Sequence, residues 1–174
     1  GDYPHYLNGK FTEWMLLNYQ KPVTVSSTLY GYYPNFAVDE DIRTYWSAST
    51  GNAGEWICTD LLDTCRIYAF QVNYADQDVQ LVGKQMGIYH QYRVWGSLDG
   101  KSWSLLIDKS ENKTDVPHDY VELSTPVEFR FLKLESLHVP AGKFAISGFR
   151  VFGKANLPLP ESVEFFSVLR GNSE

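Results

Sequence analysis

The residues with the clearest potential chemistry lie in a short run at positions 36–46, FAVDEDIRTYW. Within this run, the oxygen-bearing side chains of Asp39, Asp41 and Thr44 are separated by two and three positions. One bend can bring side chains at this spacing, together with backbone carbonyl oxygens, onto a hard cation such as Ca²⁺. The same pattern is also typical of a solvated acidic turn before a core tryptophan, here Trp46. The spacing leaves both interpretations open.

An aromatic loop precedes this run at residues 28–36, TLYGYYPNF. Its three tyrosines, Tyr30, Tyr32 and Tyr33, stand beside glycine and proline, which favours a flat, semi-rigid surface. A tyrosine ring can lie on the apolar face of a sugar while its hydroxyl stays in water. The alternative is that these rings pack on the end of the domain or on a neighbouring domain.

A second candidate loop covers residues 75–90, and loops of this length are often functional. Several of its side chains can form directional hydrogen bonds with hydroxyl groups. We therefore predict a carbohydrate-binding site made by the two loops, with the residues Tyr30, Tyr32, Tyr33, Asp76, Gln77 and His90.

The sequence contains no recognisable catalytic machinery. Its 21 acidic residues make carboxylate pairs unavoidable in any fold, and nothing singles out a pair placed across a sugar cleft. Nucleophile-elbow, phosphate-loop and His-Glu-x-x-His motifs are absent from the sequence, and the four histidines are scattered. We expect the chain to be non-catalytic.

Composition limits the possible partners. With 174 residues, the chain is about one domain long and can bury a real core. Its net charge of −6 and the lack of a basic block make nucleic acid and anionic membranes poor candidates. No apolar run approaches the roughly 18 residues needed to span a bilayer, so we expect no membrane insertion.

Strand signals dominate the middle of the chain, at residues 67–74, 91–97, 103–107, 120–123, 127–135 and 145–152. Asp99-Gly100 lies between two of these runs, and Asp-Gly in that position is a strong hairpin signal. Cys58 and Cys65 flank a predicted turn at 59–64, and free thiols are favoured over a disulfide there. Short strands with almost no helical periodicity predict an all-β sandwich or jelly roll.

Six ordered landmarks between residues 22 and 153 resemble the coagulation-factor C-type, or discoidin-like, domain. They are VSS at 25–27, AVDEDIRTYWS at 37–47, EWICTDL at 55–61, YRVWGSLDGKSW at 92–103, FRFLKL at 129–134 and FRVFG at 149–153. The bacterial relatives of this family are carbohydrate-binding modules. The resemblance implies a galactose-binding-like jelly-roll β-sandwich with eight strands.

The resemblance also implies a structural Ca²⁺ site. Matching positions place the ligands at the Phe36 carbonyl, Asp39, Asp41 and Thr44. The family usually adds a glutamate near the last strand, next to a carbonyl donor. Here Gly148 takes the glutamate position and Ser147 precedes it, so one anionic ligand is missing and we expect a weak site.

The flanks, residues 1–21 and 154–174, and the phrases WMLLNYQKPV at 14–23 and QVNYAD at 71–76 resemble the C-terminal region of bacterial family 43 glycoside hydrolases, a resemblance that covers most of the chain. We expect 1–21 to belong to a preceding domain, and 154–174 to be a linker and the first strand of a following domain. This resemblance implies an accessory domain of a secreted, periplasmic or cell-surface enzyme that acts on xylan-like plant polysaccharide, with neighbouring domains as partners. The alternatives are a structural brace that does not bind sugar and a protein- or phospholipid-binding discoidin-like domain.

Overall fold

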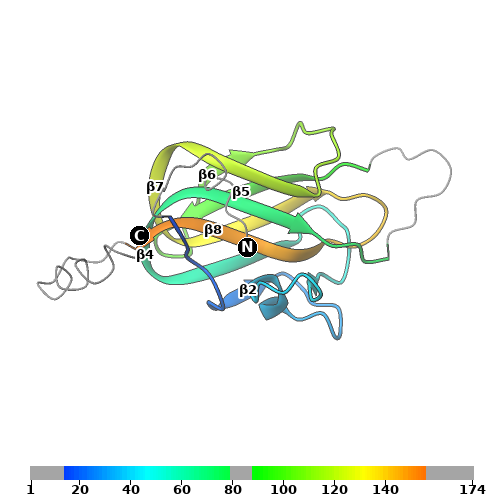
Figure 1. Ribbon diagram of the computed structural model, residues 1–174. Coiled ribbons are helices and arrows are strands. Elements are labelled where there is room, and N and C mark those ends of the chain that lie inside the picture. Colours follow the sequence, from blue (N-terminus) through cyan, green and yellow to red (C-terminus); the bar gives the residue numbers. More distant parts are fainter. Residues whose placement is uncertain (1–13, 79–87, 156–174) are drawn as a thin grey trace, which may run out of the picture.

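The computed structural model describes residues 14–78 and 88–155 (Figure 1). These residues form β-strands and one short 3₁₀ helix, which confirms the all-β prediction. The elements in chain order are β1 (Met15–Leu16), β2 (Val23–Val25), the 3₁₀ helix η2 (Pro34–Ala37), β3 (Trp46–Ser47), β4 (Trp56–Tyr74), β5 (Gln91–Ser97), β6 (Ser104–Asp108), β7 (His118–His138) and β8 (Ala145–Ala155).

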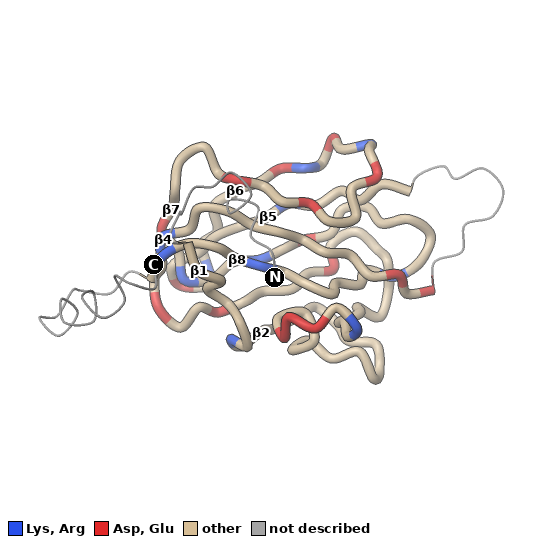
Figure 2. Tube along the Cα trace, viewed as in Figure 1, with Lys and Arg blue, Asp and Glu red and all other residues tan. Residues whose placement is uncertain are grey.

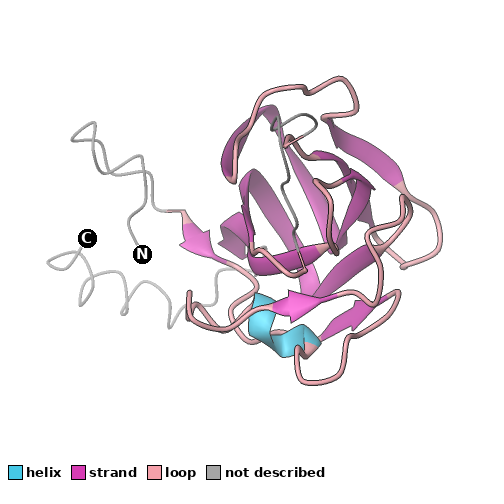
Figure 3. Ribbon diagram, turned by 90° about the vertical axis from the view of Figure 1, so that its right-hand side faces the viewer, coloured by secondary structure: helices cyan, strands magenta, loops and turns pink. Residues whose placement is uncertain are grey.

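Two long strands, β4 and β7, connect the layers of the sandwich. The strand order is β1-β8-β4-β7-β5-β6, with β2 added to β4 and β3 added to β8, and the pairing is antiparallel. The first part of β4 pairs with β2 and its second part with β8, so one strand serves both layers. Viewed from the right-hand end of Figure 1, the strands surround a common interior (Figure 3).

The sequence predicted a turn between two strands at residues 59–64, and this prediction is wrong, because β4 continues through these residues. They form an irregularity inside β4, where the pairing with β7 shifts register between Asp60 and Cys65 and Leu62 has a φ of 71°. The segments predicted as separate strands at 120–123 and 127–135 are likewise parts of β7. A bulge bends a long strand without ending it, which is how β4 can pass from one layer to the other.

Aromatic side chains fill the core between the layers. Trp46, Phe144 and Phe149 are fully buried, and the Trp46 and Phe144 rings meet edge to face at 5.4 Å. The Trp46 Nε1 donates a hydrogen bond to the Ser27 carbonyl, so the polar atom of this buried indole has a partner. The interpretation of Trp46 as a core tryptophan is confirmed.

The predicted hairpin at Asp99-Gly100 is also confirmed, between β5 and β6. Gly100 has a φ of 77°, a conformation that glycine adopts without strain. The Asp99 Oδ1 accepts hydrogen bonds from the backbone amides of Lys101 (2.8 Å) and Ser102 (3.0 Å). These bonds hold the end of the turn, and with it Trp103, above the sheet.

Part of the N-terminal flank belongs to this domain. Met15 and Leu16 pair with β8, and Leu17 is buried in the core. The predicted strand after residue 160 lies outside the described residues. Among the helices of ranges 14–78 and 88–155, none has the length and apolar character required to cross a membrane.

Cys58 and Cys65 are both buried and are not joined by a disulfide, as predicted. Burial raises the pKa of the Cys58 thiol to about 11. Because the thiolate is the reactive form, Cys58 is a poor nucleophile at neutral pH.

Candidate functional site

Tryptophans gather on the outer face of the layer formed by β2, β4, β7, β5 and β6. Trp56 on β4 is opposite Glu135 on β7, and Trp95 on β5 is opposite Lys133 on β7. Side chains alternate between the two faces of a strand. The residues between them point into the core and are fully buried: Ile57, Val94 and Leu134. The register of β4, β7 and β5 therefore places two indoles and two charged side chains next to one another on the outer face of the sheet.

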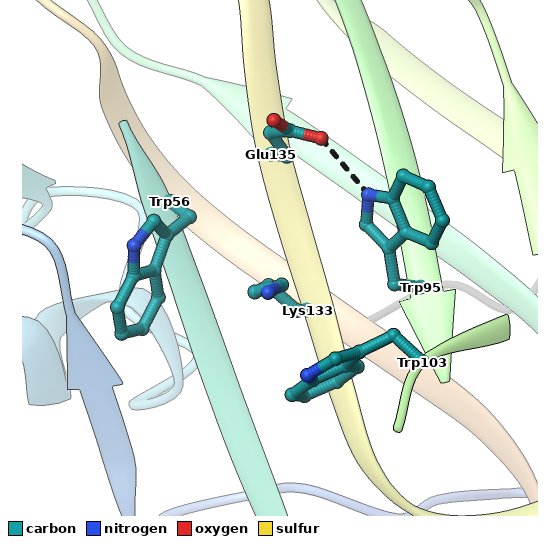
Figure 4. A pocket seen from close by; sticks show the side chains of 5 residues that line it. All are labelled: Trp56, Trp95, Trp103, Lys133 and Glu135. Atoms are coloured by element: carbon teal, nitrogen blue, oxygen red, sulfur yellow. Dashed lines mark hydrogen bonds between the residues drawn. The ribbon is translucent and has the colours of Figure 1, made fainter. Parts of the chain in front are cut away.

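Trp103, from the turn before β6, completes a groove that Figure 4 shows from close by. We call this the tryptophan groove; its lining residues are Trp56, Trp95, Trp103, Lys133 and Glu135, around a hollow of about 270 Å³. The Lys133 ammonium lies 4.2 Å from the centre of the Trp103 ring and 5.7 Å from that of Trp56. The Trp95 Nε1 donates a 2.9 Å hydrogen bond to the Glu135 Oε1.

A second hollow of about 280 Å³ adjoins the first and extends the tryptophan groove. The two hollows share Trp56, Trp103 and Lys133, so the lysine lies where they meet. The additional lining residues of the second hollow are Thr24, Cys58, Gly100 and Phe131. Half-buried indoles beside a hydroxyl, an ammonium and a carboxylate can combine ring stacking with directional hydrogen bonds.

Sequence reasoning missed this groove. Trp56 and Trp95 were visible only as landmarks of the family resemblance. The available signal was their alternation with apolar neighbours, which predicts that these indoles face away from the core. Which strands lie side by side was not visible in that pattern.

The predicted loop residues are not among those that line these two hollows, and Tyr30 and Tyr33 are their exposed aromatic part. Tyr30 is 89% exposed and Tyr33 is 42% exposed, and their rings meet edge to face at 6.3 Å. Pro34 begins η2 directly after them and thereby fixes the end of the loop.

Tyr32 turns away from that pair and stacks on Tyr45 at 4.8 Å. The Tyr45 hydroxyl donates a hydrogen bond to the Gln77 Oε1, which links two of the predicted residues through one that the prediction missed. Burial, together with the Tyr32 hydroxyl, raises the pKa of Tyr45 to about 12, so it stays protonated at neutral pH. Asp76 is exposed beside this group.

His90 is packed more tightly than the prediction assumed. Its ring stacks on Tyr74 at 3.6 Å, and within the described residues its enclosed Nδ1 has no hydrogen-bond partner. Burial and the nearby His138 lower the pKa of His90 to about 4. His90 is therefore neutral at pH 7, and contact between its ring and a sugar stays a prediction.

We expect the half-buried His90 to make folding stability depend on pH. Its pKa falls from 6.5 to about 4 on folding, so the unfolded chain binds the proton more readily. This contribution is complete above pH 6.5 and is lost as the pH falls toward 4. It should lower the free energy of unfolding by about 2–3 kcal/mol at pH 4.5 relative to pH 7.5.

Urea unfolding at these two pH values should test this, with His90→Gln as the comparison. The variant should lose less stability on acidification than the wild type. An equal loss in both proteins would assign the pH dependence to other groups.

Hydrogen bonds bring the predicted oxygen atoms of the acidic turn close together. Along the Cα trace this turn is the red stretch close to β2 (Figure 2). The Asp39 carboxylate accepts hydrogen bonds from the Asp41 amide (3.0 Å) and from the Thr44 hydroxyl (2.6 Å). Both Asp41 carboxylate oxygens are engaged by Arg43, at 3.0 and 3.1 Å. Ser147 lines a pocket together with Asp41.

These oxygen donors suit Ca²⁺ in type, because Ca²⁺ prefers carboxylate, carbonyl and hydroxyl ligands. Within ranges 14–78 and 88–155, however, no three His, Cys, Asp or Glu side chains form a metal-binding group. An ion would also compete with Arg43 for Asp41 and would replace the bond between Asp39 and Thr44. Ca²⁺ bound by Asp39, Asp41, Thr44 and the backbone at Phe36 and Ser147 stays a prediction of a weak site.

We expect a chelator to lower the melting temperature and added Ca²⁺ to restore it. The increment should grow with the ratio of Ca²⁺ concentration to Kd, because an ion that binds only the folded state stabilises it. Asp39→Ala should abolish the response, since it removes the carboxylate that organises the turn. If the melting curves of the wild type and of the variant are the same with and without chelator, the Ca²⁺ site is contradicted. The turn is then stabilised by its hydrogen bonds alone.

Fold and surface together define a galactose-binding-like β-sandwich with an aromatic outer groove. The chain belongs to the F5/8 type C domain family, whose model matches residues 22–147. This confirms the predicted discoidin-like resemblance. A comparison with curated protein sequences found no match.

Solved structures with the same fold include modules crystallised with sugars. One is chitosan-binding module 2 of a chitosanase/glucanase from Paenibacillus sp. IK-5, in complex with chitotriose: identity is 21%, the TM-score is 0.65, and 79% of this chain and 99% of that chain are covered. Another is the family 32 carbohydrate-binding module of Clostridium perfringens NanJ, in complex with galactose, with 12% identity, a TM-score of 0.64, and coverage of 80% and 98%. The third, a second module from C. perfringens, is in complex with GalNAc-β-1,3-galactose and has 16% identity, a TM-score of 0.63, and coverage of 79% and 99%. These likenesses confirm the predicted galactose-binding-like sandwich.

Proposed function

We propose that this chain is a non-catalytic carbohydrate-binding module and that the tryptophan groove is its main sugar-binding surface. The observation that carries the proposal is the gathering of Trp56, Trp95 and Trp103 around Lys133 and Glu135 on an outer sheet face. Aromatic rings in such a groove supply large apolar contact areas, and the charged groups orient hydroxyls. The sugars bound by modules of the same fold support this function.

We further propose that the module serves an exported glycoside hydrolase acting on xylan or arabinose-decorated chains. The resemblance of the flanks to family 43 enzymes supports this assignment. A weak module tethered to an enzyme raises the effective concentration of substrate at the active site without chemistry of its own. Such a module needs an open binding surface more than a deep pocket.

The exposed pair Tyr30 and Tyr33 is the second candidate surface, because Tyr30 is 89% exposed and therefore available for stacking. If sugar also binds there, Tyr30→Ala should weaken binding by about 0.5–1.5 kcal/mol, a factor of roughly 2 to 12. Calorimetry with a soluble oligosaccharide would measure this change. Unchanged affinity in alanine variants of Tyr30, Tyr32 and Tyr33 would remove the loop from the binding site.

A glycan array followed by tryptophan fluorescence tests the proposal as a whole. A binding sugar that changes the fluorescence supports the groove, since three of the five tryptophans line it. Binding without a fluorescence change, lost in the Tyr30→Ala variant, would assign the function to the loop end. No binding to any glycan would contradict the proposal.

A structural brace is the alternative that a separate observation favours. Met15 is 52% exposed and lines a mostly apolar hollow with Leu16, Leu17 and Leu61, to which Lys21 and Asp63 also contribute. Ala155 lines the same hollow, so the chain enters and leaves the described domain at one apolar surface. Solvent-exposed apolar surface of this kind is typical of contact with another domain.

A further inference from the structure

We infer that the tryptophan groove recognises an acidic sugar chain, with the carboxylate of a uronic acid bound at Lys133 in the second hollow. This inference rests on the proposed function and specifies the ligand. It follows from the position of one ammonium group and from the unequal charges of the two hollows.

Lys133 is a half-buried cation whose nearest partners are aromatic. Its ammonium lies over the faces of Trp103 and Trp56, and in the described ranges no Asp or Glu oxygen lies within 4.0 Å of it. Cation–π contacts orient such a group and leave its N–H donors available for an anion. Charge-assisted hydrogen bonds are about twice as strong as neutral ones, so a carboxylate would gain most from this site.

The two hollows differ in charge, which assigns the acidic residue to one of them. The first hollow contains Glu135 as well as Lys133, and Glu135 accepts the hydrogen bond from Trp95. A neutral sugar suits this hollow, because a carboxylate there would face Glu135. Among the described residues that line the second hollow, Lys133 is the only charged one, and the hydroxyl of Thr24 is a further donor.

Carboxylates near the second hollow already have partners of their own. Both oxygens of Asp60, one strand away from Phe131, are engaged by Arg130 at 2.8 and 3.0 Å. Asp99, beside Gly100, uses its Oδ1 to bind two backbone amides in the turn. Their repulsion of an incoming anion is thereby reduced.

The arrangement along β7 favours an internal segment of a chain over a chain end. Phe131, Lys133 and Glu135 follow one another on the outer face at intervals of about 6.6 Å, since a strand rises about 3.3 Å per residue. The two hollows are therefore consecutive along the strand, with the lysine between them. Two neighbouring sugar units, one acidic and one neutral, can occupy them together.

The test compares two ligands that differ only in one charge. The first is a xylotetraose bearing a single glucuronic acid, and the second is the same oligosaccharide after reduction of its carboxyl group to an alcohol. Calorimetry on the full chain should show tighter binding of the acidic form by about tenfold, which equals about 1.4 kcal/mol. High salt should shrink this ratio, because screening weakens a partly exposed ion pair.

Variants of Lys133 test whether its ammonium group causes the preference for the acidic oligosaccharide. Lys133→Gln should bring the ratio of the two affinities close to one, while Lys133→Arg should retain a preference for the acidic form. Lys101→Gln is the matched control: it removes the same charge from an exposed position in the nearby turn and should keep the wild-type ratio. Equal affinities in the wild type, or a ratio that survives in Lys133→Gln, would overturn this inference while leaving a sugar-binding groove intact. Failure of both ligands and of every other glycan to bind would contradict the proposed function itself.

Discussion

Trp103→Ala should reduce the affinity for a bound oligosaccharide by about thirtyfold, equivalent to about 2 kcal/mol. Trp103 lines both hollows, so its loss removes one aromatic wall from each. It lies in the turn before β6 and outside the core, and the fold should tolerate its replacement. Calorimetry would measure the affinity, and a melting curve would verify that the variant is folded.

Trp14→Ala is a suitable control, because Trp14 stacks on Tyr68 at 5.0 Å and lines neither hollow of the groove. It should bind sugar as the wild type does. Trp103→Phe should fall between wild type and alanine, since a smaller ring keeps part of the stacking area. Full affinity in a folded Trp103→Ala protein would place the sugar elsewhere.

Glu40→Ala should produce the largest loss of stability among single changes in the acidic turn. Glu40 forms a two-fold hydrogen-bonded ion pair with Arg150, at 3.0 and 2.9 Å, and the Arg150 side chain is only 8% exposed. Removing one partner of a buried pair leaves the other charge poorly compensated. Gln71, which accepts a 2.8 Å bond from Arg150, softens the effect. We expect a loss of about 2–4 kcal/mol in the free energy of unfolding.

Arg43→Ala is the matched control for this prediction. It breaks the ion pair between Arg43 and Asp41 in the same turn, but the Arg43 side chain is 85% exposed. Exposed pairs contribute little, so the loss of stability should be much smaller than in Glu40→Ala. Urea unfolding would measure the free energy of unfolding of both variants. Equal losses would contradict the prediction that the buried pair with Arg150 contributes more to stability than the exposed pair.

The all-β architecture could be predicted from the sequence because its cause is local. Segments such as 67–74 and 145–152 are rich in β-forming residues, and Asp99-Gly100 adopts the turn that its residue types favour. The placement of Trp46 in the core followed from local pattern and family resemblance, and it is confirmed. Strand ends were less predictable, because the irregularity after Asp60 bends β4 without interrupting it.

Local pattern also located the aromatic loop but did not distinguish its tyrosines. Tyr30 is exposed, whereas Tyr32 stacks on Tyr45 and connects through it to Gln77. Likewise, Asp39 and Thr44 are adjacent as their spacing suggested, but Glu40 between them turns toward Arg150, 110 positions away. Residues of one loop therefore have different roles that depend on what the rest of the chain places against them.

Only the tertiary structure brings the residues of the tryptophan groove together. Trp56, Trp103 and Lys133 are far apart in the sequence and meet because β4, β7 and β5 pair side by side. Their common orientation depends on register: a shift of one residue would move a strand's outward side chains to the core face. Sequence by itself determined that these residues lie in a β-domain with alternating faces. Long-range antiparallel pairing determined which of them share a surface, because hydrogen bonds between strands, and not spacing along the chain, set their neighbours.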